Sequence, residues 1–167
     1  MRSSLNFKEI GSGPPLIILH GLFGSAMNWR RIGDALKSHW RVVMPDLPNH
    51  GSSPWTDDMS YPAQAEALKK FIIRHDLANP SIVGHSMGGK VAMALALSGQ
   101  CLINRLVVVD IAPVSYQHSH FELIQAMQTL PLARISTRQD ADQLLAPAIP
   151  ASKLRQFLLQ NLIIENR

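Results

Sequence analysis

Short apolar runs alternate with segments of helical periodicity along the first 110 residues of the chain. The apolar runs, rich in β-branched residues, predict buried strands over 16–19, 41–44, 81–83 and 106–109. Residues 5–10 alternate apolar and polar side chains, which is typical of a half-exposed edge strand. Residues 26–38, 61–74 and 89–97 have helical spacing. This alternation of strand and helix predicts an α/β fold with a mostly parallel, doubly wound sheet.

Individual side chains mark the helix faces that are expected to pack on this sheet. Trp29, Ile32 and Leu36 form the apolar face of the first helix. In the third helix, small residues allow a close approach to the sheet. Met93 and Leu97 of that helix are interpreted as core contacts and not as part of a cofactor site.

The last third of the chain predicts helices without further strands. Helical spacing covers 121–130 and 138–145, and an apolar face runs from 154 to 162. Pro147 and Pro150 interrupt the helical pattern between these segments. We therefore divide the chain into a strand-and-helix region, residues 1–117, and a helical segment, residues 118–167.

Composition narrows the classes of function. With 46% hydrophobic and 17% charged residues the chain is typical of a globular domain. Its net charge of +4 comes from dispersed basic residues without interleaved aromatics, so no nucleic-acid partner is expected. The N-terminal residues lack an apolar signal region, no stretch approaches a membrane span, and the single cysteine, Cys101, fits a reducing compartment. These features predict a cytoplasmic protein without a membrane partner.

The candidate chemistry centres on Gly84-His-Ser-Met-Gly88, which follows one predicted strand and precedes a predicted helix. This is the context of a G-x-S-x-G nucleophile elbow, with Ser86 as the candidate nucleophile. The turn strains the serine backbone, and glycines two residues before and after relieve crowding at the bend. The alternative is a glycine-rich turn with a solvated serine.

The loop His20-Gly-Leu-Phe-Gly-Ser25, after the first buried strand, supplies the second signal. In hydrolases with this elbow, the oxyanion is bound by the N–H after the nucleophile and by an N–H from such a loop. We assign these donors to Met87 and Leu22, with Phe23 as the neighbouring alternative. His20 is expected to brace the loop as a buried ring, not to act as the general base.

Two further polar residues lie after the strand at 41–44. Asp46 stands at the carboxyl end of that strand, where open α/β sheets place their chemistry, but a role in capping the following turn is preferred. His50 is likewise expected to brace a turn before Gly51.

Together the motifs His20-Gly-Leu-Phe-Gly-Ser25, Asp46 with Asn49-His-Gly51, Gly84-His-Ser-Met-Gly-Gly-Lys90 and Asp110-Ile-Ala-Pro113 resemble the YbfF-like esterases of the α/β-hydrolase superfamily. The resemblance implies an α/β-hydrolase fold, with residues 1–117 as the N-terminal part of the core and 118–167 as a helical cap over an acyl pocket. It also implies that Asp110 is the triad acid, which would orient an imidazole. The alternative for Asp110 is a carboxylate that caps the following turn. Pro48 stands where the family usually has a basic residue.

The resemblance also implies a catalytic histidine after the final core strand, and no histidine follows His120. His118 and His120 are weak candidates for this base. We therefore expect that the chain covers the first half of the hydrolase sheet and most of the cap, with the last core strands absent. The strand at 106–109 would then be an exposed edge, open to self-association.

The leading prediction is a serine carboxylic-ester hydrolase that acts on acyl esters through a Ser-Asp-His triad whose histidine lies outside this chain. An acyl-CoA thioesterase is one alternative. A catalytically silent acyl-binding or interaction module, which kept the elbow but lost the base, is another. Hydrolysis of carbon–carbon or carbon–halogen bonds is a third alternative, against which the serine at the elbow argues, because dehalogenases carry aspartate there. No metal ion or organic cofactor is expected, because the sequence has no ligand cluster or phosphate loop.

Overall fold

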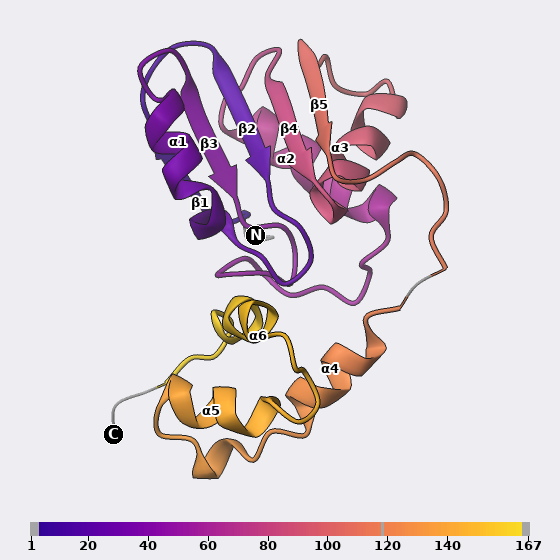
Figure 1. Ribbon diagram of the computed structural model, residues 1–167. Coiled ribbons are helices and arrows are strands. Elements are labelled where there is room, and N and C mark those ends of the chain that lie inside the picture. The colour runs from indigo at the N-terminus through magenta and orange to yellow at the C-terminus, as the bar shows by residue number, and fades with distance from the viewer. Residues whose placement is uncertain (1–3, 118, 165–167) are drawn as a thin grey trace. The chain divides into compact units, whose positions relative to one another are not determined.

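The computed structural model describes residues 4–117 and 119–164. The chain forms two compact units, Met1–Pro113 and Val114–Arg167, which are called here the first and the second unit. Figure 1 shows the sheet with its helices in the first unit and, among the described residues of the second unit, helices. In the part of the chain that the structure describes, no helix has the length and apolar character needed to cross a bilayer.

The first unit contains a five-stranded sheet with the strand order β1-β3-β2-β4-β5. The strands are β1 (Phe7–Ile10), β2 (Pro15–Leu19), β3 (Arg41–Pro45), β4 (Ser81–His85) and β5 (Arg105–Val109). Only the edge pair β1–β3 is antiparallel, and the pairs β3–β2, β2–β4 and β4–β5 are parallel. The mostly parallel, doubly wound sheet predicted from the sequence is confirmed, including the edge strand.

Helices lie on both faces of the sheet (Figure 1), which explains why the inner strands β2 and β3 are nearly continuously apolar. On one face, Ile17 and Leu19 of β2 pack in a core with α2 (Tyr61–Arg74) and α3 (Met87–Leu97). On the other, Leu16 and Ile18 pack with residues of η1 (Ala26–Trp29) and α1 (Arg30–Leu36). The period of two along the strand thus sends neighbouring residues into opposite layers.

Two predicted core contacts are wrong. Ile32 is 47% exposed and Leu97 is 86% exposed, so neither lies in the core. In α1 the buried position is Gly33, where a Cβ would stand 3.1 Å from the sulfur of Met44. In α3, Leu95 is buried instead, since it follows the buried Val91 by one helical turn.

Strand β5 is an edge of the sheet among the described strands, because it pairs only with β4. Its side chains Val107 and Val109 are 51% and 38% exposed. The predicted exposed edge is therefore confirmed for the described residues. Self-association through this edge stays a prediction.

The second unit consists of α4 (Phe121–Gln128), η2 (Leu132–Arg134), α5 (Arg138–Leu145) and α6 (Ser152–Leu159). Arg155 of α6 holds α5 through Asp142, with nitrogen–oxygen distances of 2.8 and 3.1 Å. Thr137 caps α5 by accepting the N–H of Asp140. Helices α5 and α6 are therefore held together by contacts within the second unit.

Candidate active site

Ser86 occupies the sharp turn between β4 and α3. Its backbone has φ 50° and ψ −118°, a conformation that is uncommon for residues with a Cβ. The turn is held by the Ser86 N–H, which donates to the carbonyl of Val109 on β5 at 3.0 Å. The side chain does not cap α3 and is half-buried at the carboxyl end of the parallel strands.

The two glycines of the motif are required by close backbone contacts. A Cβ at Gly84 would stand 2.5 Å from the carbonyl oxygen of Gly88. A Cβ at Gly88 would stand 2.6 Å from the carbonyl oxygen of His20 at the end of β2. Real Cβ atoms do not approach so closely, so glycine lets the elbow form and lets α3 begin directly against β2.

The loop after β2 lies beside the elbow. A Cβ built at Gly21 would be 3.2 Å from the Cβ of Ser86. The side chain of Leu22 packs against the core cluster that contains Met87. Met87 is the first residue of α3, where N–H groups lack an acceptor within the helix. Met87 thus directly follows the serine, and Gly21, the residue before Leu22, lies beside it; the oxyanion roles of Leu22 and Met87 stay predictions.

The structure distinguishes between Leu22 and Phe23 as the candidate oxyanion donor of this loop. The N–H of Phe23 donates to Nε2 of His50 at 3.2 Å. Since this N–H already has an acceptor within the fold, Leu22 is the better candidate of the two.

His20 is a buried structural ring, as predicted. Its Nδ1 donates to the carbonyl of Gly21 at 2.8 Å, and its Nε2 accepts the N–H of Leu47 at 2.9 Å. Burial lowers the pKa of His20 from 6.5 to about 4. A ring with both nitrogens engaged and a low pKa is unsuited to accept the serine proton.

Asp46 and His50 also brace the loops, as predicted. One carboxylate oxygen of Asp46 accepts the N–H of Ala26 at 2.7 Å, and the other accepts from the Asn6 amide at 2.7 Å and from the Ser52 N–H at 3.0 Å. His50 donates from Nδ1 to the carbonyl of Pro48 at 2.9 Å, and burial lowers the pKa of His50. These side chains tie the loop after β3 to the loop after β2.

Asp110 follows β5, and its side chain is 84% exposed. Its backbone has φ 56°, a second strained position beside the elbow. The partner that sequence reasoning missed is His85, whose Nε2 lies 3.7 Å from Oδ2 of Asp110. The sequence held no direct signal for this pair, because it depends on the parallel register of β4 and β5, which pairs His85 with Val109 and brings the residues after both strands together.

No catalytic base is identified among the described histidines. His118 lies outside the described residues. His120 precedes α4 in the second unit, and His85 directly precedes Ser86 with its ring in an edge contact with Trp29, at 6.3 Å between ring centroids. Within residues 4–117 and 119–164, no group of three or more His, Cys, Asp or Glu side chains is arranged to hold a metal ion.

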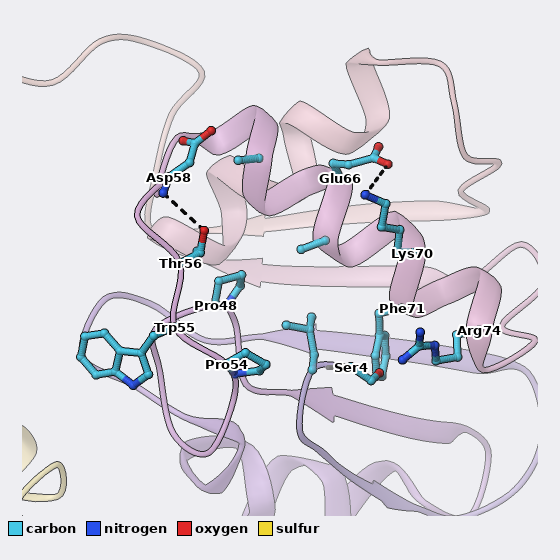
Figure 2. A pocket seen from close by; sticks show the side chains of 13 residues that line it. Ser4, Pro48, Pro54, Trp55, Thr56, Asp58, Glu66, Lys70, Phe71 and Arg74 are labelled. Atoms are coloured by element: carbon cyan, nitrogen blue, oxygen red, sulfur yellow. Dashed lines mark hydrogen bonds and ion pairs between the residues drawn. The ribbon is translucent and has the colours of Figure 1, made fainter. Parts of the chain in front are cut away.

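A groove of about 410 Å³ lies elsewhere in the first unit (Figure 2). It runs between one face of α2 and the segment 48–58, with Pro48, Pro54 and Trp55 on one side and Lys70 and Arg74 on the other. None of the residues that line it belongs to the elbow or to the loop after β2. The groove is therefore separate from the candidate active site.

Comparisons with known proteins identify the family of the chain. The chain is 42% identical over 162 residues to the sn-1-specific diacylglycerol lipase ABHD11 of Xenopus laevis, which covers 92% of this chain and 52% of the relative. It is 34% identical over 150 residues to the esterase YbfF of Escherichia coli, covering 89% of this chain and 59% of that protein. The chain spans about half the length of the curated relatives that it matches.

Among solved structures, a marine microorganism esterase superposes with a TM-score of 0.90 at 42% identity, covering 95% of this chain and 63% of that one. The model of the alpha/beta hydrolase fold family matches residues 14–159. The sheet order, the elbow at Ser86 and these matches lead to one conclusion: the chain belongs to the α/β-hydrolase family and is related to the YbfF-type esterases.

Proposed function

We propose that this chain carries the nucleophile and the oxyanion hole of a serine carboxylic-ester hydrolase. Ser86 attacks the acyl carbonyl carbon, and the negative charge that develops on oxygen is bound by the N–H groups of Leu22 and Met87. The alcohol leaves with a proton, and water then releases the acid from the acyl-enzyme. The observation that carries the proposal is the strained Ser86 backbone, at φ 50°, between β4 and α3.

Asp110 is the triad acid in this proposal. Its position after β5, beside the residues that follow β4, supports that role because a carboxylate there can orient an imidazole near Ser86. The base is a histidine outside these 167 residues. The engaged ring nitrogens of His20 and His50 support this choice, since neither ring is available to take the serine proton.

The proposed substrate is a small acyl ester, and a thioester such as an acyl-CoA is the alternative. The names of the relatives, a diacylglycerol lipase and esterases, support the ester. We further propose that residues 118–167 form a helical cap and that the protein works in the cytoplasm. Self-association through β5 would follow from the exposed valines of that edge.

The test is hydrolysis of a short-chain p-nitrophenyl ester by the chain and by Ser86→Ala, together with labelling by a fluorophosphonate. With the base outside the chain, we expect slow labelling that requires Ser86 and turnover close to that of Ser86→Ala. If the unaltered chain turns over rapidly and both Ser86→Ala and His85→Gln abolish turnover, the base is His85, beside Asp110. Failure of Ser86 to react under any condition would favour the silent acyl-binding module.

A further inference from the structure

His20 holds the peptide unit that carries the Leu22 N–H. The carbonyl of Gly21 and the N–H of Leu22 belong to one planar trans peptide, so the two bonds point in opposite directions. That carbonyl accepts from Nδ1 of His20 at 2.8 Å and from the N–H of Gly24 at 3.0 Å. Two donors on one carbonyl fix the plane of the peptide, and with it the direction of the Leu22 N–H.

His50 holds the next peptide unit along the chain. The Phe23 N–H, which follows the Leu22 carbonyl carbon, donates to Nε2 of His50 at 3.2 Å. Phe23 has φ 62°, which is a genuine outlier for a bulky residue and persists only where the surroundings hold it. The hydrogen bond to His50 is one such constraint.

The two rings form reciprocal hydrogen bonds between the loop after β2 and the loop after β3. Each donates from Nδ1 to a carbonyl of its own loop, His20 to Gly21 and His50 to Pro48. Each accepts at Nε2 an N–H from the other loop, as the Leu47 N–H does at 2.9 Å for His20. Because a carbonyl only accepts and an amide N–H only donates, both rings must be neutral with the proton on Nδ1.

Protonation of either ring would break the link between the loops. A proton on Nε2 turns the acceptor into a donor that faces another donor. The ring centroids are 5.0 Å apart, and the groups that face His50 are His20 at the end of β2 and Asp46 at the end of β3. Burial lowers the pKa of both rings, while Asp46 acts in the opposite direction. His50 is 8% exposed against 1% for His20.

We infer that His20 and His50 are positioning residues that hold the two peptide planes flanking Leu22 and so aim the Leu22 N–H at the oxyanion. This inference rests on the proposed function in one respect only, namely that the group bound by the Leu22 N–H is the oxyanion of the acyl substrate. The hydrogen bonds belong to the fold and can be measured without any turnover. Loss of the His50 acceptor, by substitution or by acid, frees the peptide unit that follows Leu22, and the loop then relaxes so that the direction of the Leu22 N–H changes.

The orientation of the Leu22 N–H can be measured by NMR on the isotopically labelled full chain. The residual dipolar coupling of this N–H is compared between the unaltered chain, His50→Ala and the control His39→Ala, whose ring is exposed beyond α1. We expect the Leu22 coupling to change in His50→Ala, while the couplings of β2 stay the same in all three. An unchanged Leu22 coupling in a folded His50→Ala chain would overturn the inference.

The unaltered chain provides a second measurement that needs no variant. N–N scalar couplings across the two N–H···Nε2 hydrogen bonds are expected near neutral pH. The Phe23–His50 coupling is expected to vanish first on acidification, together with a change of the Leu22 dipolar coupling. Absence of both scalar couplings at neutral pH would show that the two rings do not link the loops.

Labelling of Ser86 by a fluorophosphonate connects this arrangement to the proposed reaction. A misplaced oxyanion donor should slow labelling roughly ten- to a hundredfold in His50→Ala. His50→Gln, whose amide oxygen can accept the Phe23 N–H, should recover part of the rate. If the unaltered chain is not labelled at all, the proposed function fails, while the NMR measurements still decide the role of the histidines.

Discussion

Acid is expected to destabilise the first unit, chiefly through His20. Burial lowers the pKa of His20 from 6.5 to about 4, so the unfolded chain binds a proton in this interval and the folded chain does not. The free energy of unfolding is therefore unaffected by His20 above pH 6.5, falls as the pH drops toward 4, and levels off below that value. A difference of one pH unit in pKa corresponds to about 1.4 kcal/mol, so His20 alone lowers the free energy of unfolding by about 3 kcal/mol over this interval. The lowered pKa of His50 acts in the same direction.

Urea unfolding followed by tryptophan fluorescence measures this loss. All three tryptophans, Trp29, Trp40 and Trp55, lie in the first unit and report on it alone. His20→Gln keeps an acceptor for the Leu47 N–H but cannot take up a proton. It should be less stable than the unaltered chain at pH 7.5, and its loss between pH 6.5 and 4 should be smaller by about 3 kcal/mol. The exposed His39→Gln serves as the control. Equal losses in the unaltered chain and in His20→Gln would refute the reasoning.

The same unfolding assay checks three further predictions. Gly88→Ala, with its Cβ forced against the carbonyl of His20, should lose about 2 kcal/mol or more and react more slowly at Ser86 with a fluorophosphonate. Asp46→Asn, which places an amide against backbone N–H donors, should cost about 2 kcal/mol, and a neutral result would mean that Asp46 does not tie the loops. Leu95→Ala should cost about 2–5 kcal/mol, whereas Leu97→Gln should stay within about 0.5 kcal/mol; the reverse order would reinstate Leu97 as a core residue.

The local features of the first unit were readable because short stretches of chain encode them. The strands of a parallel sheet are covered on both faces, so their continuous apolar runs stand out in the sequence. The elbow was readable for a similar reason. Gly84 and Gly88 are required by close contacts with backbone atoms a few residues away or at the end of the adjacent strand. The preference for structural roles of His20, Asp46 and His50 followed from their places in turns.

Helix faces were predicted less well. A stripe of apolar residues gives the face of a helix only to within a residue or two, because 3.6 residues per turn leave several stripes open in a helix that is apolar all round. In α3, whose residues are nearly all apolar, the contact with the sheet selected Leu95 and left Leu97 in solvent.

The sequence by itself determined the succession of strands and helices along the chain and the serine at the turn, because these depend on local periodicity and on backbone strain. The family was readable from the resemblance of four short motifs. Tertiary structure alone decided which polar groups meet. The His50–Phe23 hydrogen bond joins residues 27 positions apart, and the contact of His85 with Asp110 depends on the register of two strands. Such pairs leave no periodic pattern in the sequence. They depend only on two polar groups coming within about 3–4 Å of each other in the folded chain.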